Sequence, residues 1–127
     1  MTTHLVFQTD RFRPYLPDNC QVNPNVLGFE LAEWLSRQLA ARGTITSYPD
    51  FEDWGWMLEF GEHPEEYRIC CSGAAVDDGF EWRVFAEPVK RMFRTPAPGR
   101  VPDLTAAISS LLKGEGITVT EESHGHG

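Results

Sequence analysis

The sequence predicts an α+β fold, in which a mainly antiparallel sheet of four to six strands carries two helices packed on one face. Two stretches have apolar residues at spacings of three and four, which indicates helices. Between them, three stretches alternate apolar and polar residues, which indicates half-buried strands. The chain of 127 residues suits one domain with its own core. The expected order is β-α-β-β-β-β-α-β, with residues 1–120 as the domain and residues 121–127 as a flexible tail.

The first strand is expected over residues 4–12, where aliphatic and aromatic residues favour extended chain. A loop rich in proline and asparagine follows. Asn23 and Pro24 then predict a helix start, with asparagine as the N-cap and proline at the first helical position. The helix is expected to run to about residue 42, and Gly43 supplies its end. Its apolar stripe consists of Leu27, Leu31, Trp34, Leu35 and Leu39.

The acidic and aromatic stretch after this helix is the densest part of the sequence. Residues 44–48 are expected to form a strand, and residues 50–53 an acidic turn. The next strand is expected to run from Trp54 to about residue 62. Gly55 interrupts one face of it, and a glycine inside a strand marks a bulge or a close approach by another backbone or a ligand. The opposite face carries Trp54, Trp56, Leu58 and Phe60.

The second half of the chain is expected to hold two more long strands, a helix and a short final strand. The strands cover residues 66–72 and 80–87, with a hairpin at Asp78-Gly79. A basic, proline-rich stretch over residues 88–102 leads into the second helix, and residues 117–120 form a last strand at a sheet edge. The expected core consists of Leu31, Trp34, Leu35, Leu39, Trp56, Leu58, Trp82, Val84, Ile108 and Leu111.

The charge of the protein limits its partners. It has 19 acidic residues against 11 lysines and arginines, which gives a formal charge of −8. Such a charge repels nucleic acid and anionic membranes, and it suits a basic partner or simply solubility. The first residues lack the features of a signal peptide, and no apolar run reaches the roughly 20 residues that span a bilayer. We therefore expect a soluble, cytoplasmic protein that binds neither nucleic acid nor membrane.

Motifs for catalysis or cofactor binding are absent from the sequence. It has no phosphate-binding glycine loop and no serine-hydrolase motif. Cys20, Cys70 and Cys71 form no Cys-x-x-Cys pair and are expected to be reduced packing residues. The histidines lack metal-ligand spacing. We therefore expect no catalytic residues, no metal ligands and no cofactor.

The acidic turn and the two ends of the strand after it form the candidate binding surface. Exposed carboxylates speed association with a basic surface, and tryptophan is enriched at binding hot spots. A structural interpretation is also open: the carboxylates are solvated turn residues, and the tryptophans pack in the core. The candidate partner-binding residues are Asp50, Glu52, Asp53, Trp54, Glu62, Glu65 and Glu66.

The first helix and this strand start carry a resemblance to known proteins. The pattern runs from Asn23-Pro24-Asn25 through Gly28-Phe29-Glu30-Leu31-Ala32-Glu33-Trp34-Leu35 to Glu52-Asp53-Trp54-Gly55-Trp56. It is similar to small, mostly uncharacterised bacterial proteins in which an amphipathic helix precedes a strand that starts with the sequence Glu-Asp-Trp-Gly-Trp. Some such acidic α+β proteins resemble the immunity proteins of bacterial toxin systems. The resemblance implies a protein that neutralises a basic toxin, and it implies no catalytic residues.

Three hypotheses for function follow. The first is a non-enzymatic, immunity-type binding protein that meets a basic protein partner through its acidic surface. The second is an enzyme that acts on a small molecule or depends on a metal, with Asp53, Glu59 and His63 around a pocket floored by Gly55. The third is a homo-oligomeric structural module, such as a homodimer, that pairs through a strand edge or the tryptophan face.

Overall fold

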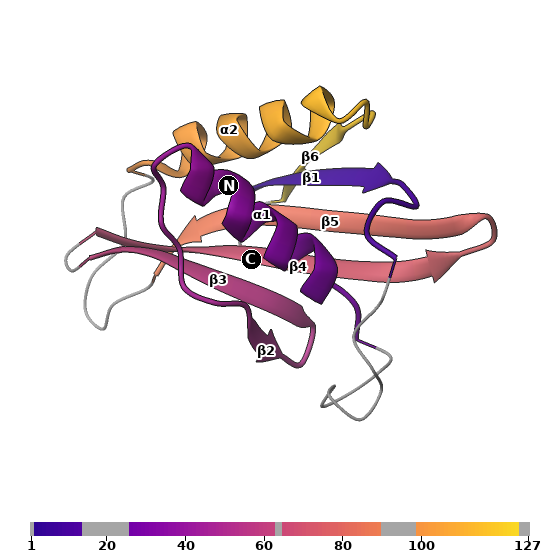
Figure 1. Cartoon of the computed structure of the whole chain (residues 1–127), viewed down its shortest axis with the longest axis horizontal. Coiled ribbons are helices and arrows are strands. Elements are labelled where there is room, and N and C mark those ends of the chain that lie inside the picture. Colours follow the sequence, from indigo (N-terminus) through magenta and orange to yellow (C-terminus); the bar gives the residue numbers. More distant parts are fainter. Residues whose placement is uncertain (1, 14–25, 63–64, 90–98, 125–127) are drawn as a thin grey trace.

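The computed structural model describes residues 2–13, 26–62, 65–89 and 99–124. Six strands form one antiparallel sheet in the order β2-β3-β4-β5-β1-β6 (Figure 1). The order of elements along the chain is the predicted β-α-β-β-β-β-α-β. The strands are β1 (Thr2–Gln8), β2 (Asp50–Glu52), β3 (Gly55–Glu62), β4 (Glu65–Val76), β5 (Gly79–Pro88) and β6 (Thr120–His124); the helices are α1 (Phe29–Ala41) and α2 (Val101–Gly114).

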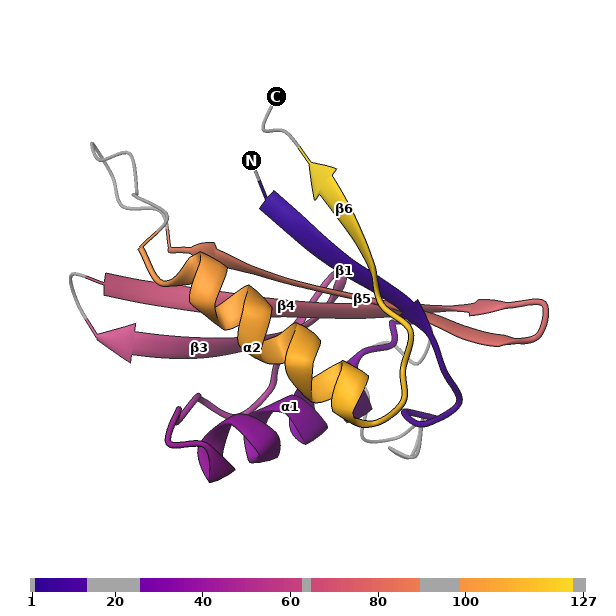
Figure 2. The ribbon, with the colours of Figure 1, turned by 90° about the horizontal axis from the view of Figure 1, so that it is seen from above.

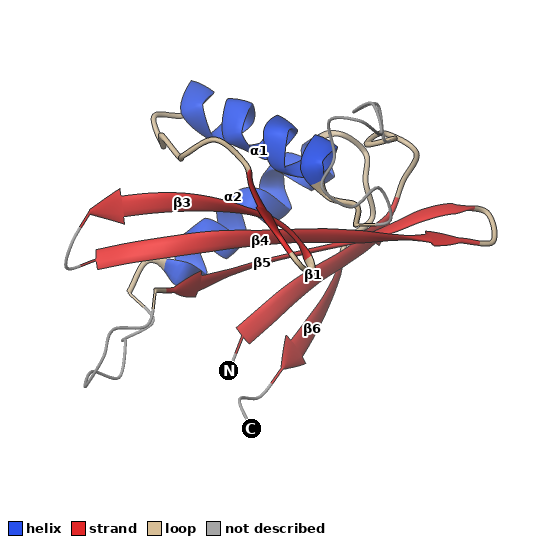
Figure 3. Cartoon of the chain, turned by 90° about the horizontal axis from the view of Figure 1, so that it is seen from below, coloured by secondary structure: helices blue, strands red, loops and turns tan. Residues whose placement is uncertain are grey.

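Both helices cover the same face of the sheet, as predicted (Figures 2 and 3). Helix α1 packs against β3 and β4, and α2 packs against β5 and β1. Of the ten expected core residues, all but Trp34 are buried, and Trp34 is partly buried against Phe12. Each buried large apolar side chain contributes about 1.5–3 kcal/mol before chain entropy is subtracted. The other face of the sheet carries no helix in the part of the chain that is described.

Helix α1 begins later than the sequence predicts. Its first residue is Phe29, and the expected N-cap pair Asn23-Pro24 lies outside the described residues. Gly28 precedes the helix with a φ of 134°, and a Cβ there would lie 2.7 Å from the carbonyl oxygen of Cys71. The end of α1 is as predicted: Gly43 has a φ of 90°, and the Thr44 N–H donates to the Leu39 carbonyl at 2.9 Å.

Three expected strand boundaries are wrong. The first strand ends at Gln8, and the chain then turns so that Phe12 packs in the core. The strand expected over residues 44–48 is irregular chain instead, held to β3 by a hydrogen bond from the Ser47 N–H to the Glu59 carbonyl at 2.8 Å. The expected acidic turn at residues 50–53 is in part a strand, since Asp50–Glu52 form β2.

The end of the chain also differs from the expectation. Residues 117–119 are not a strand, and Thr120–His124 form β6, which pairs with β1 along its length. The flexible tail expected from Glu121 onward is therefore wrong as far as His124. None of the described helices is both long and apolar enough to cross a membrane.

Candidate functional site

Strand β2 and the turn after it place their side chains on different sides of the sheet. The pairing of Phe51 with Trp56 puts both rings on the helix face, with their centroids 5.6 Å apart. Asp50 and Glu52 flank Phe51 in the strand and therefore point to the face without helices. The two carboxylates lie at the outer strand of the sheet, where β2 has only β3 as a neighbour.

The turn from β2 to β3 consists of Asp53 and Trp54. Glu52 pairs with Gly55, so the alternation of strand side chains stops before Trp54. Trp54 is consequently 44% exposed, whereas Trp56 is 8% exposed and packs against Phe29 and Phe51. The expectation that Trp54 shares the buried face of Trp56 is wrong, and the tryptophan in the turn is accessible to a partner.

Gly55 explains why this turn lies so close to β4. A Cβ at Gly55 would be 2.2 Å from the carbonyl oxygen of Cys71. The glycine therefore marks the close approach of another backbone, one of the alternatives that the sequence left open beside a bulge and a ligand. The gap that was expected to floor a pocket at Gly55 is filled by the backbone of β4.

The segment before β2 adds two exposed apolar side chains that the sequence did not single out. Ile45 is 70% exposed and Tyr48 is 85% exposed. Among the described residues, the exposed large hydrophobic side chains are Ile45, Tyr48, Trp54 and Val76, so three of the four lie in residues 45–54. The available signal was the lack of apolar neighbours at strand spacing, because the residues two before and two after Ile45 and Tyr48 are Gly, Ser, Thr and Asp. An apolar residue in an extended chain without such neighbours has no core face to join. We call the surface formed by Ile45, Tyr48, Asp50, Glu52, Asp53 and Trp54 the β2 edge surface.

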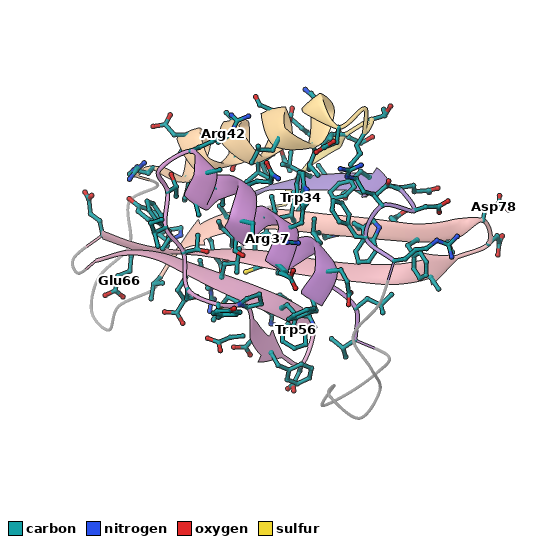
Figure 4. All side chains as sticks on the ribbon, in the orientation of Figure 1. Trp34, Arg37, Arg42, Trp56, Glu66 and Asp78 are labelled. Atoms are coloured by element: carbon teal, nitrogen blue, oxygen red, sulfur yellow. The ribbon has the colours of Figure 1, made fainter. Side chains whose placement is uncertain are left out.

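The second group of predicted acidic residues lies at the other end of β3. Glu62 pairs with Glu65 where β3 turns into β4, seven residues along the strand from Gly55. At about 3.3 Å per residue, the two ends of β3 are roughly 23 Å apart. Figure 4 shows Glu66 far from Trp56 along the β3–β4 pair, and Glu65 is exposed while Glu66 is half-buried. The structure thus divides the predicted surface into two, and only Asp50, Glu52, Asp53 and Trp54 are brought together.

The stretch of sequence that forms the β2 edge surface carries charge of one sign. No lysine or arginine occurs between Arg42 and Arg68, and seven carboxylate residues do: Asp50, Glu52, Asp53, Glu59, Glu62, Glu65 and Glu66. Of the arginines nearest to this stretch, Arg68 pairs with Glu87, and Arg37 pairs with Glu33 at 2.9 Å. No ion pair between Arg42 and the carboxylates of the β2 edge surface occurs among the described residues, so these carboxylates are available to a cationic partner.

A groove of about 500 Å³ lies beside this surface, between α1 and residues 45–48. Figure 4 shows Arg37 on the side of α1 that faces away from the sheet. The lining consists of Glu33, Ser36, Arg37 and Ala40 from α1, and of Ile45, Thr46, Ser47 and Tyr48 from the segment that follows it.

The groups expected for an enzyme are not assembled in the described part of the chain. Asp53 lies in the turn, Glu59 is exposed on β3, and His63 lies outside the described residues. Among the described residues, no cluster of three or more His, Cys, Asp or Glu side chains is suited to hold a metal ion. Burial raises the pKa of Cys70 to about 12, assisted by the charge of Glu87, and burial also raises the pKa of Cys71. Both thiols are therefore protonated at neutral pH and are poor nucleophiles.

Comparison of the chain with protein-family models, with curated proteins and with solved structures finds no match.

Proposed function

We propose that the protein is a non-enzymatic binding protein whose β2 edge surface contacts a basic surface on a protein partner. One observation carries the proposal: in the described part of the chain, three of the four exposed large hydrophobic side chains gather beside three carboxylates in a stretch without lysine or arginine. An immunity-type role, in which the partner is a basic toxin, is the narrower form of this proposal. It rests on the acidic surface and on the resemblance of the helix and strand start.

The size of the β2 edge surface suits one interface. Tyr48 and Trp54 are six residues apart, so their Cα atoms are separated by at most about 22 Å. A standard interface covers about 800 Å² on each partner, a patch roughly 30 Å across. Tyrosine and tryptophan supply apolar contact at the centre of such interfaces, and the carboxylates increase the rate of encounter with a cationic surface.

The backbone of β2 is poorly suited to pairing with a strand of the partner. The strand has three residues, and Pro49 directly before it has no N–H to donate. The exposed Asp50 and the half-buried Glu52 also oppose edge-to-edge pairing with a second copy of the same chain. The proposed contact is therefore made by side chains, and the partner differs from this protein in charge.

The test compares partner capture by three versions of the full chain. One is the wild type, and one carries Asp50→Lys together with Asp53→Lys on the β2 edge surface. The control carries Asp77→Lys together with Asp78→Lys at the exposed tip of the β4–β5 hairpin (Figure 4), which changes the net charge equally. We expect wild type and control to capture the same protein from a lysate of the source cell, with a Kd that rises with salt, and the β2 variant to bind it at least tenfold more weakly.

Equal capture by all three versions would contradict the proposal. So would a captured protein that binds the control variant as weakly as the β2 variant, because binding would then follow net charge and not this surface. Circular dichroism and thermal unfolding of each variant establish that the substitutions leave the fold intact.

A further inference from the structure

The groove beside the β2 edge surface presents mainly hydrogen-bond acceptors. The hydroxyl of Ser36 donates to the Glu33 carbonyl at 2.8 Å. The hydroxyls of Thr46 and Ser47 donate to the carbonyls of Ser47 and Tyr48 at 3.0 and 3.1 Å. Each hydroxyl has a single proton, so these oxygens can offer a ligand only lone pairs. The Ser47 oxygen already accepts from the Glu59 N–H at 2.9 Å, which leaves the Ser36 and Thr46 oxygens as the main acceptors. Such a lining favours a ligand group that donates hydrogen bonds.

The side-chain cation of the groove is already neutralised. Arg37 binds the Glu33 carboxylate at 2.9 Å, so the lining has no net charge. In the sequence, the charges next to the lining residues are Arg42, two residues after Ala40, and the carboxylates of Asp50, Glu52 and Asp53, which follow Tyr48. Three carboxylates against one guanidinium give a local potential that favours a cation over an anion.

The mouth of the groove offers an aromatic face and an aliphatic side chain. Tyr48 is 85% exposed and Ile45 is 70% exposed, and both line the groove. A guanidinium group stacks on an aromatic ring more readily than an ammonium group, and its aliphatic stem packs on apolar side chains. The protein already makes one such contact elsewhere, where Arg100 lies with its Cζ 4.9 Å from the centre of the Phe60 ring.

We propose that this groove receives an arginine side chain of the protein partner. The guanidinium stacks on Tyr48 and donates to the hydroxyl oxygens of Ser36 and Thr46, while its stem lies along Ile45. Arginine is preferred to lysine because its planar group has five donors in fixed directions and can serve the ring and the hydroxyl oxygens together. This inference rests on the proposed function, since it names the anchor residue that the partner inserts next to the β2 edge surface.

The experiment uses short peptides in place of the unidentified partner. The probe is an acetylated and amidated Gly-Arg-Gly peptide, titrated into isotopically labelled protein at constant ionic strength and followed by two-dimensional NMR. Matched peptides replace arginine by lysine, by citrulline, which has the same shape without the charge, or by glutamate. We expect saturable shifts of the amide signals of residues 36 and 45–48 with the arginine peptide, at least threefold weaker binding of the lysine peptide, and no saturable shift with the citrulline peptide.

Variants of the groove sharpen the test. Tyr48→Ser is expected to weaken binding of the arginine peptide at least threefold, and Tyr48→Phe to preserve it, because the stacking needs the ring and not its hydroxyl. Tyr48 is exposed, so both variants are expected to fold. The absence of saturable shifts with the arginine peptide would overturn the inference, and so would stronger binding of the glutamate peptide, which would assign the groove to an anion held by Arg37.

The two proposals fail in different ways. If the arginine peptide does not bind but the Asp50→Lys, Asp53→Lys variant loses its partner, the arginine inference alone is overturned. If that variant keeps its partner, the proposed function is overturned whatever the peptides do.

Discussion

The two outer strands of the sheet both carry carboxylates, but the carboxylates have different surroundings. At β6, Glu122 accepts a hydrogen bond from the Arg83 guanidinium at 3.1 Å, and the same guanidinium nitrogen lies 2.9 Å from Nδ1 of His4. The His4 ring stacks on Phe85 with centroids 4.2 Å apart. At β2, by contrast, Asp50, Glu52 and Asp53 lie in a stretch of 25 residues between Arg42 and Arg68 without a lysine or arginine.

The two outer strands also differ in the apolar side chains that they expose. Strand β6 is Thr-Glu-Glu-Ser-His and has no large hydrophobic residue, while the chain around β2 exposes Ile45, Tyr48 and Trp54. The β6 carboxylate is used within the fold, where it joins strands β1, β5 and β6 through Arg83. Carboxylates at a sheet edge can therefore be used within the fold, as at β6, or lie next to exposed aromatic rings in a stretch without lysine or arginine, as at β2. The proposed contact uses the second kind.

The largest expected effect follows from Gly55, which holds the β2–β3 turn against β4. Gly55→Ala places a Cβ 2.2 Å from a backbone oxygen that cannot move without disturbing the sheet. We expect a loss of about 3 kcal/mol in the free energy of unfolding, because overpacking against a fixed backbone is at the severe end of such substitutions. Urea unfolding followed by tryptophan fluorescence measures it.

Gly114→Ala is the control for this substitution. Gly114 ends α2, and a Cβ there would meet no atom within 4 Å. We expect the free energy of unfolding to stay the same or rise by up to about 1 kcal/mol, because alanine has the higher helix propensity and restricts the unfolded chain. An equal loss of stability in both variants would mean that glycine flexibility, and not the contact with Cys71, governs the β2 side of the sheet.

The order of elements could be predicted because each long element carries a periodic pattern over its whole length. Leu31, Leu35 and Leu39 recur at four-residue spacing, and Trp56, Leu58 and their partners in β4 and β5 recur at every second residue. These patterns depend only on which face is buried, so they also predicted most of the core.

The ends of elements could not be predicted in the same way. Alternation continues through Trp54 in the sequence, but the chain turns there, so the tryptophan leaves the buried face. Strand β6 has a polar sequence and gains its place from backbone pairing with β1 and from Arg83, 39 residues away from Glu122. Such partners are distant in the sequence and leave no local pattern.

The candidate site was predicted in part. Asp50, Glu52, Asp53 and Trp54 are neighbours in the sequence, so the turn keeps them together. The acidic residues at the β3–β4 turn were grouped with them on composition, and the length of β3 separates the two groups. The groove was missed because it forms between α1 and the irregular segment at residues 45–48, which the sequence suggested was a strand.

A smaller loss of stability is expected when the hydrogen bonds of Arg83 to β6 and β1 are removed. Arg83→Met keeps much of the aliphatic stem but removes the donor that Glu122 and His4 share. We expect the free energy of unfolding to fall by about 1–2 kcal/mol, since both hydrogen bonds are part-buried and one joins charged groups. Hydrogen exchange followed by NMR is expected to show faster exchange of β6 amides, with the β2–β3 amides unchanged.

The control for Arg83 is an arginine with an ordinary surface ion pair. Arg37→Met removes the i,i+4 contact with Glu33, in which the Arg37 side chain is 71% exposed. We expect the free energy of unfolding to fall by at most about 0.5 kcal/mol. If Arg83→Met lowers the free energy of unfolding no more than Arg37→Met does, then backbone pairing alone holds β6. The difference between the two sheet edges is then not electrostatic.

The smallest effect on stability is expected for a substitution of Trp54. This substitution is also the most direct test of whether the β2 edge surface binds a partner. Trp54→Ser removes a side chain that is 44% exposed and lies outside the strand, so the free energy of unfolding is expected to change by less than about 0.5 kcal/mol. Binding of a captured partner is expected to weaken at least tenfold, because truncating a tryptophan at an interface centre typically costs more than about 1.4 kcal/mol. Val76→Ser is the matched control, since Val76 is 37% exposed on β4, away from β2, and is expected to change neither quantity. A loss of stability well above 1 kcal/mol for Trp54→Ser, with partner binding unchanged, would assign this tryptophan to the fold and leave the β2 edge without its central contact.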